Sequence, residues 1–428
     1  MNLFLIIWIL LFLILLKVIF GSSRRTERWV ISRWYSSRRA LVRVQFQPKL
    51  SEGKHRRNRG VALLVVLGFV VVLVVLASAF AINMQVEAKL ARNAEAESDV
   101  DWLCRSGVEM AKYVLSQQMA NTQEPYDSLN QSWAGGPGNT KGFNPFFETL
   151  NLTNNAWGEG TVLGLIFPDE EPEGNMRCSI QITDMERKFN INRAAERSMG
   201  RYPLEQTFEM MGVDVSLIPY LVDAIIDWRD QDDAVGVNGA ESDFYEPLGY
   251  FAKNGPIDDL RELLLIKDIT PEMYWGNAAN SLAAGTMPTP VEEEDESLNY
   301  EYALVDLFTP ISLGYININT APAEVLQLVP LPGNPAVTAE AIVNMRVGLD
   351  GLEGTVDDDP YDSVSQLQQV PGFSRDAVTN AARFFSVRSS TFEVRVTASA
   401  RGQERTLVAM VQRKNPKEIK ILYTYWES

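Results

Sequence analysis

Residues 54–82 read KHRRNRGVALLVVLGFVVVLVVLASAFAI, a basic cluster and a glycine followed by an uncharged run. The run, Val61–Ile82, has 22 residues without a charge and is dense in Val and Leu. As a helix rising about 1.5 Å per residue it is about 33 Å long, enough to cross the hydrocarbon core of a bilayer. This stretch therefore predicts a membrane-spanning helix that begins directly after a basic flank.

The helical pattern continues beyond the membrane segment. Polar residues begin at Asn83, and apolar residues then recur at close to helical spacing through about Met119, which predicts a stem helix with one face to bury. A basic flank, a small residue, an apolar span and a continuing polar helix resemble the type IV prepilin signal. An ordinary single-span anchor explains this stretch equally well, so the rest of the chain has to decide.

Charge is distributed unevenly along the chain. Residues 1–60 hold 13 Lys/Arg and 2 Asp/Glu, whereas residues 61–428 hold 26 and 53 and carry a net charge of −27. Basic residues before a span and acidic residues after it follow the positive-inside rule. We therefore expect the span in a bacterial inner membrane and the globular head in the periplasm. An acidic surface disfavours nucleic acid as a partner and suits cations.

A second apolar run, Leu3 to Phe20, is interrupted by Lys17 and lies far from the glycine of the prepilin-like signal. It is too long for a signal-peptide core. It is either a real extra span or the result of an upstream translation start that adds unrelated residues, and we favour the second. Residues 1–60 are treated as a basic leader with an extra hydrophobic segment.

Histidine and cysteine limit the chemistry of the head. The only histidine is His55, which excludes a His-dependent triad or a His-ligated zinc site beyond Gly60. The two cysteines, Cys104 and Cys178, are too few for a zinc cage. They form one disulfide or stay as two buried thiols, and both alternatives are open. The sequence has no G-x-S-x-G, phosphate loop or metal-protease pair, so we expect no enzyme.

Strand-like runs lie on both sides of a mostly helical middle. Residues 161–167 and 177–183 precede it, and residues 386–413 alternate as strands after it. This order predicts an α+β, pilin-like fold in which an N-terminal transmembrane helix packs on a small antiparallel sheet. The large all-α insertion between the strands is expected to be similar to SAM or helix-hairpin-helix domains.

The predicted domains follow from this order. They are a leader (1–60), a transmembrane stem helix (61–120), the first part of the head (121–196), the helical insertion (197–385) and the C-terminal strands of the head (386–428). The insertion divides into two units at about 197–284 and 315–385, with an acidic linker between them. An internal echo supports two related units, since Lys188–Ala194 reads KFNINRA and Tyr315–Ala321 reads YININTA. In each, an apolar strand end leads through Asn into a helix start, where Asn or Thr caps exposed N–H groups.

With these features in view, residues 54–414 resemble the K family of minor pseudopilins, known as general secretion pathway protein K, of the type II secretion system. The stem signal is shared by all pilins, but the Asn-rich motif with the inserted helical domain is far more specific. The motifs that carry the resemblance are Gly60-Val61 with the stem, DWRD at 227–230, GAE at 239–241, ININTAPAEVL at 316–326 and the C-terminal hairpin.

The resemblance implies a processing route and a set of partners. A prepilin peptidase would cleave after Gly60 and Val61 would be N-methylated, which leaves a single span. The implied partners are the I and J minor pseudopilins and the inner-membrane assembly platform. The implied function is to initiate or cap the pseudopilus at its tip and so support export of folded proteins across the outer membrane. Val65 occupies the position where most pilins carry Glu, and K subunits characteristically lack that Glu.

Two other functions compete with this interpretation. A type IV pilus tip or adhesion subunit would share the same stem. Residues 317–346 also resemble DNA-binding helix-hairpin-helix units, with a hairpin at 331–335, and residues 370–374 resemble a second hairpin; the alternative is then a membrane-anchored DNA-binding protein. However, residues 315–385 hold three Lys/Arg and nine Asp/Glu. Because phosphate contacts dominate DNA affinity, this composition argues against nucleic acid.

Two Gly-containing loops concentrate carboxylates, the second of them at 350–359. Calcium takes six to eight oxygen ligands in flexible geometry, and glycines let carboxylates converge. Both loops are equally explained as solvated turns. The resemblance implies structural calcium in the helical domain, which favours the first loop. Its candidate ligands are Asp227, Asp230, Asp232, Asp233, Glu241 and Asp243.

Overall fold

The computed structural model describes residues 59–137, 163–167, 176–276 and 300–427. The extra apolar run at 3–20 and the acidic linker therefore lie outside the described residues. The chain divides into two compact parts, Met1–Ala79 and Phe80–Ser428, which we describe separately.

Helix α2, Arg59–Ala120, contains the predicted span and the predicted stem. It is the one described helix that is long and apolar enough to cross a membrane. Its Val and Leu side chains from Leu63 to Leu76 are exposed, apart from half-buried Val72, as expected for a helix surrounded by lipid or by the apolar faces of other helices. The prediction of an N-terminal apolar helix is confirmed.

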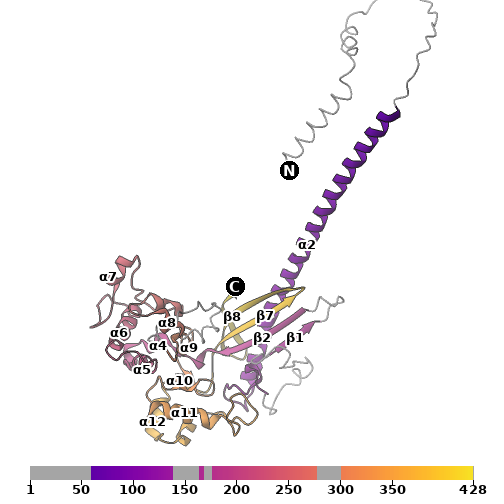
Figure 1. The fold of residues 1–428 in the computed structure, drawn as a ribbon. Helices are drawn as coiled ribbons and strands as arrows, with labels where there is room; N and C mark the ends of the chain where they lie inside the picture. The colour runs from indigo at the N-terminus through magenta and orange to yellow at the C-terminus, as the bar shows by residue number, and fades with distance from the viewer. Residues whose placement is uncertain (1–58, 138–162, 168–175, 277–299, 428) are drawn as a thin grey trace, which may run out of the picture. The chain divides into compact units, whose positions relative to one another are not determined.

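A five-stranded antiparallel sheet follows the order β1-β2-β7-β8-β9 (Figure 1). Strand β2, before the helical insertion, pairs directly with β7, after it, so the sheet closes across the inserted residues. The alternation recognised in the sequence ended near Arg413, and β9 lies beyond it. The strands are β1 Leu163–Phe167, β2 Met176–Asp184, β7 Thr391–Ala400, β8 Gln403–Asn415 and β9 Glu418–Glu427.

The C-terminal half of α2 packs on one face of this sheet. Apolar residues spaced one helical turn apart, among them Val100, Val108 and Leu115, share a core with Ile180 and Val396. Gly107 permits the close approach, because a Cβ there would lie 2.6 Å from Cγ1 of Val396. Periodicity predicted this buried face from Val100 onward, and the sheet supplies its partner, whereas Val86 and Leu90 of the same pattern are exposed. The mixed helix-and-sheet fold is confirmed.

Cys104 and Cys178 both lie in this stem-sheet core as free, buried thiols. The structure therefore has two buried thiols and not the disulfide. Each thiol points at a backbone carbonyl, Cys104 at Val396 and Cys178 at Leu103. Burial raises the pKa of Cys104 to about 11 and that of Cys178 to about 12, so both thiols are protonated at neutral pH.

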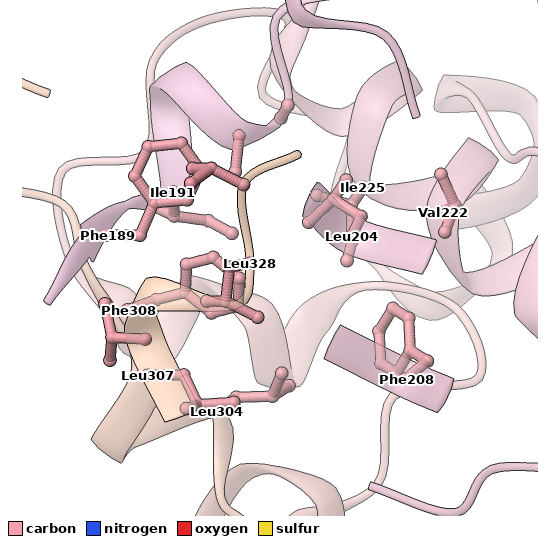
Figure 2. Packing of buried hydrophobic residues seen from close by; sticks show 14 of the residues in the cluster. Phe189, Ile191, Leu204, Phe208, Val222, Ile225, Leu304, Leu307, Phe308 and Leu328 are labelled. Atoms are coloured by element: carbon pink, nitrogen blue, oxygen red, sulfur yellow. The ribbon is translucent and has the colours of Figure 1, made fainter. Parts of the chain in front are cut away.

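The residues between β2 and β7 form a separate core. Phe189 stacks on Phe308 with ring centroids 6.5 Å apart, and Ile191, Leu204 and Ile225 belong to the same cluster (Figure 2). The α-helices of this region are α4 Ile191–Ala194, α5 Tyr202–Met210, α6 Ile218–Arg229, α7 Ser242–Tyr245, α8 Pro271–Trp275, α9 Leu304–Leu307, α10 Ala323–Leu326, α11 Pro335–Arg346 and α12 Arg375–Ala381. The 3-10 helices are η1 Ser132–Ala134 before β1, and η2 Met185–Arg187, η3 Arg197–Met199, η4 Glu246–Leu248, η5 Leu260–Leu265 and η8 Val364–Gln369 within the insertion.

The sequence predicts helices over Leu204–Asp230 and Leu260–Tyr274, and the structure interrupts both. The expected helix from Leu204 to Asp230 is split into α5 and α6, since Gly212 between them takes a positive φ of 76°. The expected helix from Leu260 to Tyr274 is split into η5 and α8, because Thr270 caps a new helix that begins at Pro271. Apolar periodicity continued through both breaks, which is why the sequence did not reveal them.

The internal echo corresponds to repeated local structure. In the first copy, β3 (Phe189–Asn190) pairs in parallel with β4 (Phe308–Thr309). In the second copy, β5 (Ile316–Asn317) pairs in parallel with β6 (Phe385–Ser386). Each short pair brings the start of a helical unit next to its end.

The second Asn of each motif fixes a distant segment in the same way. Asn192 donates to the carbonyl of Ile257 at 2.8 Å and accepts from its N–H at 2.6 Å. Asn319 donates to the carbonyl of Tyr361 at 2.9 Å and accepts from its N–H at 2.8 Å. A two-bond Asn-to-backbone bracket thus closes each unit.

The resemblance between the units continues past the bracketed residue. Ile257 is followed by η5, whose first turn is capped by the Glu262 carboxylate accepting from the N–H of Asp258. Tyr361 is followed by η8, where the Gln366 side chain accepts from the N–H of Asp362. We therefore call the two stretches unit A (Phe189–Thr309) and unit B (Ile316–Ser386).

A buried polar network joins stem, sheet and insertion. Arg413 of β8 forms an ion pair with Asp127, and both side chains are almost fully buried. Asp184, at the end of β2, accepts hydrogen bonds from Ser389, Asn317 and Thr320. Because these partners come from the head and from unit B, the network orients the insertion relative to the sheet.

Candidate metal centre

The first acidic loop leaves the end of a buried helix. Helix α6 buries most of its surface in the unit A core, and Asp223 and Asp227 lie one turn apart on it. The chain then runs through residues 230–241 to the start of α7. The loop therefore returns over the C-terminal end of α6, the helix that carries Asp223 and Asp227.

Three carboxylates converge at this point. Asp227, Asp230 and Glu241 each offer an oxygen, and these oxygens lie within 4.8 Å of one another. Asp227 and Glu241 are 1% and 2% exposed. Across the described residues, no other group of three or more acidic, His or Cys ligands comes together in this way.

Glu241 lacks partners within the described protein. Both of its carboxylate oxygens are buried, and neither has a hydrogen-bond partner. Burial, followed by the negative charges of Asp227 and Asp230, raises its pKa to about 7. Burial also raises the pKa of Asp227, although the N–H of Gly236 donates to it at 2.9 Å. Buried carboxylates without partners are costly, so this geometry favours a bound cation or a proton.

Two glycines shape the loop around Asp227. A Cβ at Gly239 would lie 1.9 Å from Oδ2 of Asp227, and a Cβ at Gly236 would lie 2.8 Å from Oδ1. A side chain at either position would displace the carboxylate. The loop is therefore built to enclose Asp227 closely.

The other three predicted ligands lie outside this group. Asp232 and Asp233 are exposed and hold the loop, Asp232 by accepting from the N–H of Ala234 and Asp233 by accepting from Ser242 and Asn254. Asp243 is exposed in the first turn of α7. The structure thus brings three of the six predicted ligands together, because adjacency in sequence does not fix where side chains point.

Asp223 was missed by the sequence analysis. Its Oδ2 accepts two hydrogen bonds from Asn238, one from the backbone N–H and one from the side chain, both at 3.2 Å. Arg201 pairs with its other oxygen. Its position one helical turn before Asp227 was the available signal.

The second acidic loop satisfies its own carboxylates. Asp357 accepts from the N–H groups of Leu349 and Asp350 at 2.6 and 3.2 Å and from the Thr355 hydroxyl at 2.7 Å. The hydrogen bond from Thr355, with those from the backbone, holds the Asp357 pKa below its usual range. Buried Arg346 pairs with Glu353. The second loop therefore supplies protein partners for Asp357 and Glu353.

The residues of the first loop fit calcium on chemical grounds. The donors are oxygens only, which excludes a soft-metal preference, and a glycine-rich loop allows flexible geometry. The unpartnered Glu241 oxygens would give such an ion a place to bind.

Gly60 and Val61, the predicted processing site, lie in the first turn of α2.

Comparison with known proteins agrees with the resemblance drawn from the motifs. The profile of the family "Type II secretion system (T2SS), protein K" matches residues 187–276, which begin two residues before unit A and include the three converging carboxylates. The type II secretion system protein K of Pseudomonas aeruginosa is 25% identical over 223 residues. That match covers 50% of this chain and 58% of the relative, so the chain spans just over half of the relative's length.

The fold agrees as well. The crystal structure of the GspK-GspI-GspJ complex from the type 2 secretion system of enterotoxigenic Escherichia coli aligns with a TM-score of 0.52 at 15% identity, covering 79% of this chain and 99% of that one. The resemblance to protein K of type II secretion is confirmed. Both protein K names describe a component of a secretion system.

Proposed function

We propose that the chain is a minor pseudopilin at the tip of the type II secretion pseudopilus, where it initiates or caps assembly. The observation that carries the proposal is α2 itself, an apolar span continuous with a stem that packs on an antiparallel sheet. Such a helix anchors the subunit in a membrane and then packs among other stems in a filament. Val65 stands where most pilins carry Glu. Without that carboxylate the subunit lacks a contact with a neighbouring subunit inside the bilayer, which supports a place at the end of the filament.

The proposed partners are the I and J minor pseudopilins, the prepilin peptidase and the inner-membrane platform. The structural neighbour is itself a complex of GspK with GspI and GspJ, which supports the first two. We propose an inner-membrane location with the head in the periplasm, supported by basic residues before α2 and a net charge of −27 after Gly60.

Processing is the first test. We expect the mature chain from wild-type cells to start at N-methylated Val61, and the chain from cells without prepilin peptidase to keep its leader. N-terminal sequencing and intact mass measure both. An uncleaved chain in wild-type cells would contradict the pseudopilin proposal.

The tip role is tested separately by deletion. Loss of protein export with normal surface adhesion and twitching is the expected result. Loss of adhesion with normal export would favour a pilus tip adhesin instead.

We also propose that Asp227, Asp230 and Glu241 hold a structural calcium ion. The ion would supply positive charge that offsets the repulsion among these carboxylates. Asp227 and Glu241 would anchor the two ends of the loop, and Asp223 would position it through Asn238.

Terbium is a direct probe of this site, because it replaces calcium and Trp228 is adjacent to Asp227 on α6. We expect Trp-sensitised terbium emission from the full chain in detergent, displaced by calcium and lost in Glu241→Gln. Trp228→Phe should lose the emission while keeping the calcium-dependent shift in melting temperature. Emission unchanged in Glu241→Gln would contradict the site.

A further inference from the structure

Two buried acidic residues lie where the sheet meets the helical insertion. Asp184 ends β2, Glu186 lies in η2, and each is 2% exposed. The backbone N–H of Glu186 donates to Oδ1 of Asp184 at 2.8 Å, which closes a tight turn around the pair. Neither residue belongs to the group of carboxylates at the metal centre.

The pair holds segments that are distant in the sequence. Glu186 accepts from the N–H of Thr391, the first residue of β7, at 2.9 Å, and from the N–H of Leu313 at 3.4 Å. Leu313 lies in the link between units A and B. Asp184 accepts from two side chains of unit B and from one just before β7. The two carboxylates therefore join unit B and the link to the sheet.

The described residues provide no counter-ion for this pair. None of the ion pairs among them includes Asp184 or Glu186. Arg413 instead pairs with Asp127, and Lys188 and Arg388 each donate to a backbone carbonyl, at 2.8 and 2.6 Å. Two like charges buried together are costly, and the pair relieves this cost by keeping one proton. The charged groups on the elements around the pair are Asp127, Arg187, Lys188, Asp306, Arg388, Glu393 and Arg413.

Glu186 holds a proton at neutral pH and lies next to a route to solvent. Burial, followed by repulsion from Asp184, raises the pKa of Glu186 to about 8, and burial also raises the pKa of Asp184. Thr391, which donates its N–H to Glu186, lines a cavity of about 280 Å³. Leu422 lines the same cavity and is exposed, so solvent reaches the backbone that holds Glu186.

We propose that Asp184 and Glu186 form a pH-sensitive lock between the sheet and the insertion, closed while the pair shares one proton and open once that proton leaves. On opening, the O–H bond of the Glu186 carboxyl breaks and the proton passes to water or hydroxide. The two carboxylates then repel each other, which loosens the contacts of this turn with unit B and with the link. The lock does not depend on the proposed role at the pseudopilus tip.

The direction of the pH effect follows from the carboxyl that keeps the proton. Because the native pKa of Glu186, about 8, is higher than the unfolded value of about 4.3, its stabilising contribution is complete below the unfolded value. The contribution is lost as pH rises through about 8. The lock is therefore closed in acid and at neutral pH, and it opens in alkaline solution.

Infrared spectroscopy of the full chain in detergent tests the shared proton. We expect a carboxylic-acid C=O band at pH 6 that disappears by pH 10, with a component that Glu186→Gln removes. Glu241→Gln is the matched control, because Glu241 is also 2% exposed and its pKa is also raised by burial. This control should keep the component that Glu186→Gln loses. Absence of the band in wild type, or a band unchanged by Glu186→Gln, would overturn the proposal.

A distance measurement tests the opening. Spin labels on Glu404→Cys in β8 and Asn380→Cys in α12 report on the sheet and on unit B, because both positions are exposed whereas the two native cysteines are buried. We expect double electron–electron resonance to give a narrow distance distribution at pH 6 that broadens at pH 9. Glu241→Gln should broaden in the same way, and Glu186→Gln should stay narrow.

Three results would overturn the lock. They are an unchanged distribution in wild type, broadening that persists in Glu186→Gln, and broadening that Glu241→Gln abolishes. Both wild-type measurements decide the matter even where Glu186→Gln fails to fold. None of these results depends on cleavage at Gly60, so they are separate from the tests of the proposed function.

Discussion

Units A and B share a scaffold but use their carboxylates in opposite ways. In both, a 12-residue helix ends at an Arg and leads into a glycine-containing acidic loop. In both, a glycine packs on an Asp, Gly239 on Asp227 and Gly348 on Asp357, with Cβ approaches of 1.9 and 2.2 Å.

The difference lies in what faces the acids. Backbone N–H groups and Thr355 serve Asp357, and Arg346 serves Glu353. In unit A, Glu241 has no protein partner. The same local architecture thus supports a loop that satisfies Asp357 and Glu353 and a loop that leaves Glu241 without a protein partner, and partner groups rather than acid count distinguish them.

The largest effect is expected in unit B. Arg346 is 4% exposed and also donates to the carbonyl of Ile318, so Arg346→Met leaves Glu353 and that carbonyl without their partner. Breaking a buried ion pair costs about 3–5 kcal/mol, and partial exposure of Glu353 places the loss near about 3 kcal/mol. Urea unfolding measures it. The loss in free energy of unfolding should be equal with and without calcium. A loss that depends on calcium would contradict the claim that unit B satisfies its own charges.

Calcium should act on unit A alone. At a calcium concentration 100 times the Kd, binding stabilises the native state by about 2.7 kcal/mol. Glu241→Gln should abolish the stabilisation, whereas Asp357→Asn should preserve it. Melting temperature with calcium or with a chelator is the measurement. A stabilisation that survives Glu241→Gln and is lost in Asp357→Asn would show that calcium binds in unit B instead.

The paired brackets give a matched comparison. Asn192→Ala and Asn319→Ala each remove two hydrogen bonds to backbone, worth about 1–3 kcal/mol when the abandoned groups stay buried. Asn319 is buried and Asn192 is only half-buried, so the Asn319 variant should lose more free energy of unfolding. The reverse order would contradict the structural equivalence of the two units.

The two units should also differ in pH dependence without calcium. The raised pKa of Glu241, about 7, means that its stabilising contribution is complete below the unfolded value of about 4.3 and is lost as pH rises through 7. The lowered pKa of Asp357 means that its contribution is present above about 3.9 and is lost as pH falls below that value. Urea unfolding of wild type and Glu241→Gln from pH 4 to 8 should give curves that diverge only above pH 5. Parallel curves would contradict the burial of Glu241 as a carboxylate that has no partner.

The sequence determined the features that rest on local periodicity and composition. Val61–Ile82 specified an apolar helix, and the spacing beyond it specified which side of the stem is buried, since both depend only on neighbours along one helix. Strand alternation before and after the helical middle specified a mixed fold. The repeated Asn motif marked the start of each unit because the bonds of its first Asn are local. Asn190 caps α4, whereas Asn317 accepts from the N–H of Asn319 in a turn and α10 has no side-chain cap.

Tertiary structure decided the features that depend on residues distant in the chain. Six acids lay close together in sequence, but only the return of the loop over α6 brings Asp227, Asp230 and Glu241 together. Cys104 and Cys178 could be placed only once the stem packed on β2. The edge position of β9 likewise follows from the order of strands in the sheet. Side-chain convergence is set by packing between elements, and a linear pattern does not encode it.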